Sequence, residues 1–491
     1  MFKNPVYKQA AKNLAFLVFA IVLTRFSKGL FLGVMTIAGI VWAFSNKPGK
    51  ALSLYLMIIS MVDVNPILLP AGGLFGILVR FGPLLIGLSL MMRGLRAGGQ
   101  SRMPLGMLVA FLLIAIISSI DGWAPMVSYL KIANFIVFLL GFWFGLTALI
   151  KDFSGVDYLR STFLAYSVFL ILGSAVILPF PGISTLSGFE LAMREGNVDA
   201  ANLAMMSAGG TDALFCGVTR QSQSFAVLAG MVMAWLIADM LFVEKRFSKP
   251  HLLLIGVGVP LLYLSRSRVG LFSLMVGILM VAVWLPNKIM MPAMVKHRLK
   301  RGVSALLVLV VVGSVFSEIS NDSISRWLRK SEDVEGDSRS LSEAITSSRL
   351  GLIDESMRDF RRNPMLGSGF QVAKYTAEQI ARSGSSFVIS APIEKGLLPI
   401  MVLGETGVVG AIVFAMFLIS FYSTSCRRRL YVTAALFTVL LATNMGEATF
   451  FSPGGSGGLL WTVSIVGGYC IDMTLAKERK LYANLPYNYY P

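Results

Sequence analysis

Charged residues are scarce in this chain. Only 14% of its 491 residues are Asp, Glu, Lys or Arg, whereas 55% are hydrophobic, and the mean hydropathy is +0.72. A water-soluble domain needs a far more polar surface, so the composition excludes a soluble globular protein. Apolar stretches of about 17 to 25 residues can cross the hydrocarbon core of a bilayer as helices. We therefore predict an all-α polytopic membrane protein with about fourteen transmembrane helices.

The predicted spans follow one another closely in most of the chain. They are 13–24, 29–45, 51–70, 73–92, 104–120, 128–150, 158–179, 223–243, 252–265, 269–285, 303–317, 398–423, 429–445 and 458–475. They give six regions: N-terminal transmembrane helices (1–179), an extracytoplasmic loop (180–222), central transmembrane helices (223–317), a large extracytoplasmic loop (318–397), C-terminal transmembrane helices (398–475) and a cytoplasmic tail (476–491). Long irregular connections are often functional, so function is expected on the extracytoplasmic face.

Histidine and cysteine are also rare. Cys216, Cys426 and Cys470 fall on an outer loop, on an inner loop and inside a span, so no disulfide framework is predicted. His251 and His297 both fall at cytoplasmic loops, where solvated side chains are expected. We predict neither a metal site nor a cofactor. GxxxxGK[ST] and HExxH are absent, and the GxSxG match, GGSGG at 454–458, lies in a Gly-rich turn before a predicted span, so soluble nucleotide and hydrolase chemistry has no support.

Acidic residues are outnumbered, with 26 Asp and Glu against 43 Lys and Arg and a net charge of +17. The basic residues gather at the N-terminus and at 46–50, 93–102, 244–249, 288–301, 426–429 and 477–480. With fourteen spans, all these segments fall on one side, as the positive-inside rule predicts for cytoplasmic loops. Both termini are therefore placed in the cytoplasm, and the expected partner of the positive charge is anionic membrane lipid rather than nucleic acid.

Three arginines break this charge bias. Arg266 and Arg268, in LLYLSRSRVGLFSLMVG, fall in an extracytoplasmic turn, and Arg220 falls on the same side. One interpretation is that the first two lie among lipid headgroups with snorkelling side chains. The other is that these three and Arg349 converge on an anion, because the guanidinium fork donates paired hydrogen bonds to phosphate. A lipid-linked pyrophosphate is the natural anion at that depth, and arginines can neutralise its charge as it leaves, without a metal.

The large loop contains a predicted amphipathic helix. The stretch SSRLGLIDESMRDFRRNPMLGSGF carries apolar residues at helical spacing from Leu350 to Phe360, and Asn363 with Pro364 forms a stop. The helix, 348–362, is expected to lie along the membrane surface or to close over a cavity.

Acidic residues near the next span are candidates for a base. Glu394 lies just before that span, where it could take a proton from an acceptor hydroxyl or simply be solvated. Glu405 lies inside the span and is expected to face the bundle, in a structural or a catalytic role. Lys395, Asn444 and Glu447 are further candidates for lining the same outer cavity.

These pieces together resemble the O-antigen ligase and O-antigen polymerase superfamily of bacterial envelope glycosyltransferases. The matching elements are Arg220 with the span that follows it, the SRSRVG turn, the amphipathic segment ending in NPMLGSGF, the GETGVVGA span start and NMGEATFF. The resemblance implies a C-type glycosyltransferase fold and an undecaprenyl-pyrophosphate-linked glycan as donor. It further implies transfer to an acceptor hydroxyl with inversion and without a metal. It also implies that Arg220, Arg266 or Arg268, and Arg349 hold the pyrophosphate.

The chain departs from the ligase branch at one place. Where ligases carry a His-Asn pair, this chain has Glu394 and Lys395 followed by Gly396. We therefore predict that Glu394, Arg268 and Arg349 act in catalysis, and that polymerisation or another glycan transfer is favoured over ligation to lipid A-core. The expected acceptor is a glycan or a lipid, the expected location is the bacterial inner membrane, and polysaccharide export or chain-length proteins are possible partners.

A transporter, such as a lipid-linked glycan flippase, is the competing class. A transporter should carry ionisable residues near the midplane of both halves. In residues 1–180 the clearest embedded charges are Asp63 and Arg80, and the polar features concentrate later in the chain. This asymmetry favours an enzyme, while a noncatalytic glycan-binding assembly partner is a third hypothesis.

Overall fold

The computed structural model describes residues 4–45, 47–65, 68–69, 73–96, 106–149, 153–180, 215–245, 247–265, 267–288, 353–354, 356–371, 397–446 and 449–483. Within these ranges the regular structure is helical, apart from one isolated antiparallel bridge between Val64 and Thr219. The all-α prediction holds for this part of the chain.

The helices follow the predicted spans closely. The first group is α1 (Pro5–Phe26), α2 (Leu30–Phe44), α3 (Pro48–Ser60), α4 (Gly73–Arg96), α5 (Gly106–Ser118), α6 (Pro125–Leu149) and α7 (Phe153–Ile177). The second group is α11 (Ser222–Ala238), α12 (Lys249–Leu264), α13 (Arg268–Leu279), α14 (Leu285–Lys288), α19 (Leu398–Arg427), α20 (Tyr431–Thr443), α21 (Ser456–Trp461) and α22 (Gly468–Ala483). Short 3-10 or π-helical turns extend several of them: η1 (Met61–Asp63), η2 (Asp239–Val243), η3 (Met280–Trp284) and η4 (Thr462–Gly467). Every predicted span except 303–317, which lies outside the described residues, overlaps a helix.

Proline sets the start of several helices. Pro5, Pro48, Pro250 and Pro399 each lie at the first or second position of their helix. Proline is tolerated there because its missing N–H would have had no partner within the helix. At α1 the side chain of Asn4 also caps the helix by accepting from the amide of Val6 (3.0 Å). These local signals explain why apolar runs begin as helices where they do.

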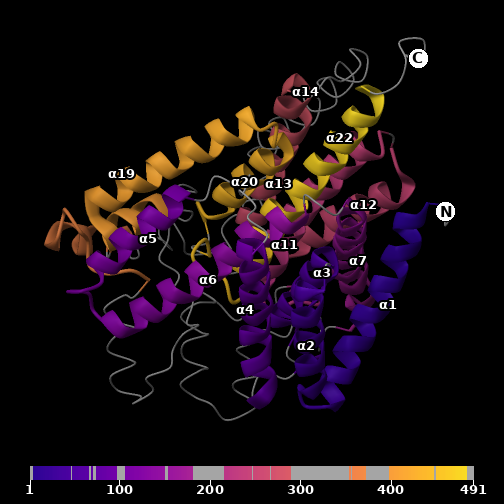
Figure 1. The fold of residues 1–491 in the computed structure, drawn as a ribbon, viewed down its shortest axis with the longest axis horizontal. Helices are drawn as coiled ribbons and strands as arrows, with labels where there is room; N and C mark the ends of the chain where they lie inside the picture. The colour runs from indigo at the N-terminus through magenta and orange to yellow at the C-terminus, as the bar shows by residue number, and fades with distance from the viewer. Residues whose placement is uncertain are drawn as a thin grey trace, which may run out of the picture.

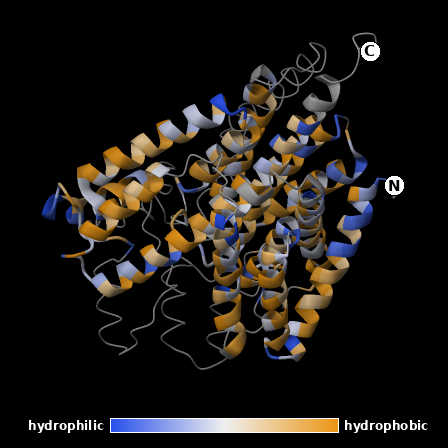
Figure 2. Cartoon of the chain, in the orientation of Figure 1, coloured by the Kyte–Doolittle hydropathy of each residue, from blue (hydrophilic) through white to orange (hydrophobic). Residues whose placement is uncertain are grey.

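The helices form a bundle in which α11 is central. It packs against α12, α13 and α20, while α1 packs against α7 and α2 against α3 and α4 (Figure 1). Of the residues in the most apolar 18-residue stretch of each helix, 89% are buried in α11 with η2 but only 28% in α1. The outer helices expose large apolar side chains such as Phe19 and Ile37. Figure 2 shows hydrophobic residues along most of each helix and hydrophilic residues mainly at the ends.

This pattern is that of a multi-pass membrane protein. Among the described residues, seven helices are long and apolar enough to cross a bilayer, and five apolar helices are shorter. The number of fourteen spans and the C-type glycosyltransferase fold stay predictions. The beginning of α1 and the end of α22 lie toward the same side of the molecule (Figure 1).

The predicted span 51–70 extends too far. The α-helix ends at Ser60, and the turn Met61–Asp63 leads into backbone pairing with another segment. The amide of Asn65 donates to the carbonyl of Val218 (2.8 Å). Asn65 precedes a proline, which disfavours helical conformation, so the helix could not continue. Asp63 therefore lies at the end of the bundle rather than within a span.

Candidate active site

The two arginines Arg220 and Arg268 lie at the same end of two neighbouring helices. Helices α11 and α13 run side by side in the same direction. Small residues between them let their backbones approach closely. A Cβ added to Gly270 would lie 2.6 Å from the Cβ of Ala226, and one added to Gly277 would lie 2.6 Å from the Cβ of Ala234. Arg220 precedes the first residue of α11 by two positions, and Arg268 is the first residue of α13.

Helix geometry makes this end of the bundle favourable for an anion. The first turn of a helix has unpaired N–H groups and a partial positive charge. Two such ends lie next to each other here, and each carries an arginine. This arrangement brings together fixed dipoles and permanent charges of the same sign. We call it the arginine end: Arg220, Arg268 and the first turns of α11 and α13.

The backbone of Arg220 is held firmly by its neighbours. Its amide donates to the carbonyl of Asp63 (2.7 Å), and the hydroxyl of Thr219 donates to the carbonyl of Cys216 (2.7 Å). The amide of Val218 donates to the hydroxyl of Ser174 on α7 (3.0 Å). No described residue accepts a hydrogen bond from the Arg220 guanidinium. Its backbone is therefore fixed, while its side chain stays partly exposed.

Arg268 follows a helix cap and adjoins the ends of two other helices. The hydroxyl of Ser267 accepts from the amide of Gly270 (3.5 Å), which fixes the start of α13. Val269 packs against Gly446, just after the end of α20, so closely that no side chain fits there. Deeper, the hydroxyls of Ser273 and Thr443 are 2.7 Å apart. These contacts place the end of α20 beside Arg268.

Asn444 belongs to the same end of the bundle but is wholly buried. Its carbonyl accepts from the amide of Leu398 (3.1 Å), so α19 also begins here. Its side-chain amide donates to the carbonyl of Leu440 (2.8 Å). Asn444 thus joins the end of α20 to the start of α19, and its side chain already bonds the backbone of α20.

Glu405 lies beside a break in α19. The break is at Gly407, whose φ of 64° and ψ of −167° fall in a region that glycine alone adopts readily. Glu405 is buried, with 3% exposure, as expected for a residue that faces the bundle. Its carbonyl accepts from the amide of Gly369 (3.1 Å) and from the hydroxyl of Ser118 on α5 (2.5 Å).

The segment 363–371 crosses α19 at this break. The amide of Ser368 donates to the carbonyl of Gly404 (3.0 Å). On the other side of the break, the amide of Val408 donates to the carbonyl of Pro364 (2.9 Å). The crossing segment supplies the hydrogen bonds that α19 loses where its helix is interrupted. The NPMLGSGF and GETGVVGA motifs are therefore a single structural unit.

The predicted amphipathic helix ends where the sequence indicates. Residues 356–362 are helical, and a bend follows at Asn363, whose side chain accepts from the amide of Leu366 (3.3 Å). The guanidinium of Arg362 lies 4.5 Å from the ring centroid of Trp123. Residues 348–352, with Arg349, lie outside the described residues. Glu394, Lys395, Arg266 and Glu447 also lie outside them, so their roles stay predictions.

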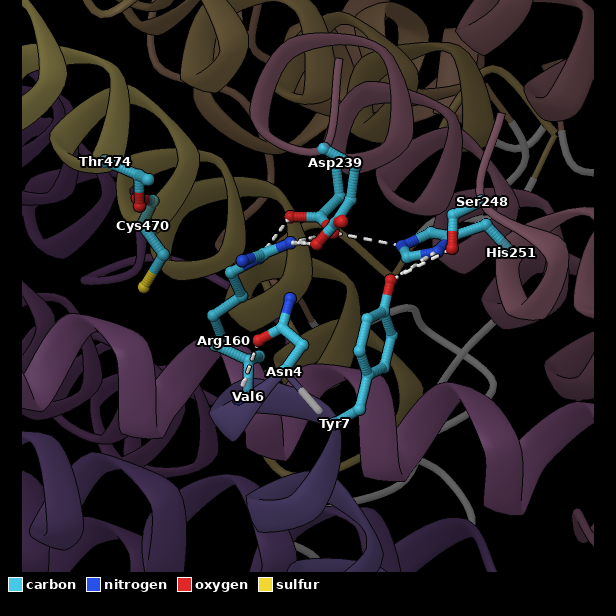
Figure 3. A network of polar contacts seen from close by, with 10 residues as sticks. Asn4, Val6, Tyr7, Arg160, Asp239, Ser248, His251, Cys470 and Thr474 are labelled. Carbon is cyan, nitrogen blue, oxygen red and sulfur yellow. Dashed lines mark hydrogen bonds and ion pairs between the residues drawn. The ribbon is translucent and has the colours of Figure 1, made fainter. Parts of the chain in front are cut away.

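The structure contains a buried ionic network that the sequence interpretation missed. Arg160 of α7 donates to both carboxylate oxygens of Asp239 (2.6 and 2.8 Å) and to Glu244 (2.7 Å). The Nε2 of His251 lies 3.0 Å from Oδ2 of Asp239, an oxygen that also accepts from Arg160, and the hydroxyl of Tyr7 on α1 lies 3.0 Å from that of Ser248. Figure 3 shows Tyr7 of α1, Arg160 of α7, Asp239 of η2 and His251 of α12 converging. Asp239 is about 26 Å along its helix from Ser222, at 1.5 Å per residue, so the network is remote from the arginine end.

The prediction that His251 is a solvated loop residue is wrong. His251 is fully buried near the start of α12, where Asp239 and Tyr7 surround it. The signal that could have revealed the network was a lone carboxylate, Asp239, in the apolar run AWLIADMLFV. An embedded charge in such a run requires a partner.

Among the described residues, no three His, Cys, Asp or Glu side chains are grouped to hold a metal ion. The three cysteines are free.

Residues 251–415 match the protein-family model described as O-antigen ligase. This match supports a place for this part of the chain in the O-antigen ligase and polymerase superfamily. The matched part of the chain includes Arg268, the 363–371 crossing and the break in α19. Asp63, Arg220 and the end of α20 lie outside the match, although the fold brings them to the same end of the bundle. A comparison with curated proteins gave no significant match. The match suggests a membrane enzyme of the O-antigen ligase or polymerase type, a family whose substrates are lipid-linked glycans.

Proposed function

We propose that the protein is a membrane glycosyltransferase that polymerises or ligates an undecaprenyl-pyrophosphate-linked glycan at the periplasmic face of the inner membrane. The observation that carries this proposal is the arginine end, where Arg220 and Arg268 lead two adjacent helices that point the same way. Both termini would then be cytoplasmic, in agreement with the common side of α1's start and α22's end.

The chemistry requires a stabilised leaving group. The acceptor hydroxyl oxygen forms a bond to the anomeric carbon while the bond from that carbon to the pyrophosphate oxygen breaks. A single displacement of this kind inverts the anomeric centre. The electron pair goes to the pyrophosphate, and preorganised guanidinium groups and helix N-termini stabilise the added charge without a metal. In this proposal Arg266 and Arg349 add to the same charge, and Glu394 takes the proton of the hydroxyl.

The direct test is Arg268→Ala, assayed for polymer production in cells with protein levels matched. Loss of one preorganised donor to a developing charge reduces rates by about 100- to 1,000-fold. The matched control is Arg427→Ala, the same chemical change at the opposite end of the bundle, where Arg427 is exposed and bonds only Ser423 among the described residues. It should leave polymer production near the wild-type level. Unchanged production by Arg268→Ala would remove the arginine end from the mechanism.

The transporter hypothesis gains one observation from the structure. Arg160, Asp239 and Glu244 are embedded charges that the sequence argument did not count, so the two halves differ less in polarity than expected. Those groups already bond one another, however, so their charges are balanced within the network. A reconstituted assay that measures flipping and chain growth separately distinguishes the enzyme from the flippase. The enzyme lengthens the glycan on the side of the membrane where the donor is supplied, whereas a flippase only moves the donor across the membrane.

A further inference from the structure

The carboxylate of Asp63 lies near Arg220, but the two side chains do not form an ion pair. Asp63 ends the turn η1 after α3, and its own carbonyl accepts the amide of Arg220 (2.7 Å). The residue is buried, at 9% exposure, and its Oδ2 has no hydrogen-bond donor among the described residues. A buried carboxylate oxygen without a hydrogen-bond donor destabilises the fold, so its position next to a candidate anion site needs an explanation.

The charged surroundings of Asp63 come from three elements. Arg220 lies on the adjacent segment 215–221, Tyr166 faces it from α7, and Arg80 of α4 interacts electrostatically with Arg220. Burial raises the pKa of the Asp63 carboxyl to about 6, although the positive charge of Arg220 opposes this rise. Of the two histidines, His251 lies in the remote network and His297 lies outside the described residues, so Asp63 is the group described at this end that titrates near pH 6.

We propose that Asp63 is a positioning residue of the anion site: it fixes the backbone of Arg220 and serves as its titratable counter-charge, so that a diphosphate binds together with a proton. This inference rests on the proposed function, because it assigns regulation to the same arginine end. It adds a residue from the N-terminal helices, which the matched family region does not include.

The coupling has a definite sign. An ionised Asp63 offsets part of the charge of Arg220 and repels an incoming anion. Protonation removes that negative charge, so anion affinity increases as the pH falls through about 6. By linkage, the bound anion in turn favours the protonated carboxyl, and each tenfold gain in affinity equals a rise of one in its pKa. After transfer, loss of this proton would help the diphosphate product to leave.

The test uses the purified full-length protein in detergent with inorganic sulfate as probe, because the charge of sulfate is constant over the pH range. Binding is measured from the increase in unfolding temperature with sulfate concentration. The wild type should bind sulfate about tenfold more tightly near pH 5 than near pH 8. Asp63→Asn is isosteric and always neutral, so it should bind tightly at both values. Asp63→Glu should restore the pH dependence.

The matched control is Asp121→Asn, the same change at an exposed carboxylate in the turn between α5 and α6. It should keep the wild-type pH dependence. If Asp63→Asn binds sulfate with the wild-type pH dependence, or more weakly at both values, the proposal is overturned. A merely structural role predicts the second of these outcomes. Glycan transfer is measured in parallel: a wild type that binds sulfate but never transfers glycan would refute the proposed function and leave the role of Asp63 standing.

Discussion

Replacing Gly407 by alanine should destabilise the crossing at the break in α19. The backbone conformation of Gly407 is one that residues with a side chain adopt only at a cost of about 1–3 kcal/mol. The added methyl group would also overlap the carbonyl of Met365 on the crossing segment. That contact is with backbone, so a flexible side chain cannot relieve it by rotating.

The magnitude follows from the contacts that must shift. Moving segment 363–371 away from α19 breaks the bonds that Val408 and Val409 donate to the carbonyls of Pro364 and Met365 (2.9 and 3.3 Å). Each such bond contributes about 1 kcal/mol. Added to the backbone strain, the expected loss is about 3–5 kcal/mol. Because the crossing is part of the matched family region, glycan transfer should fall as well.

Thermal unfolding of the purified variant in detergent, followed by tryptophan fluorescence, is the appropriate assay. The matched control is Gly256→Ala in α12, where the new methyl group would meet no atom within 4 Å. Alanine is a better helix former than glycine by up to about 1 kcal/mol, so the control should be neutral or slightly stabilised. A Gly407→Ala protein as stable as this control would refute the assignment of the break and its crossing.

Two further predictions concern the helix contacts. Arg160→Met should destabilise the protein by about 3–5 kcal/mol, because it leaves Asp239 buried without its bidentate partner. Adding Asp239→Asn should recover part of this loss of stability. Thermal unfolding of the single and double variants measures both effects. Gly270→Val should force α11 and α13 apart, since even one methyl group would lie 2.7 Å from the carbonyl oxygen of Ala226. Its glycan transfer should fall with little change in protein level, and wild-type transfer would argue against the close approach of the two helices.

The sequence predicted the helices well because their signal is local. Long apolar runs, prolines at helix starts and the stop at Asn363 each act within a few residues. The span 51–70 was too long because apolar content continues past Ser60, whereas the chain turns there to pair Asn65 with Val218. That pairing joins residues far apart in the sequence, and no local pattern encodes it.

The candidate site was predictable in part. Arg220 and Arg268 stood out because they violate the charge bias, and the fold places them at one end of adjacent helices. Asp63 was expected to be embedded but was not linked to Arg220, whereas His251 was wrongly expected to be solvated. A single charged or titratable residue near a helix end is compatible with solvent, and only the packing of other helices around it decides that it is buried.

The most direct test of the account is a structure of the protein with a bound lipid-linked diphosphate. We expect the phosphate oxygens to lie within hydrogen-bonding distance of the guanidinium groups of Arg220 and Arg268, at the first turns of α11 and α13. A diphosphate bound elsewhere, with these two side chains on separate surfaces, would contradict it.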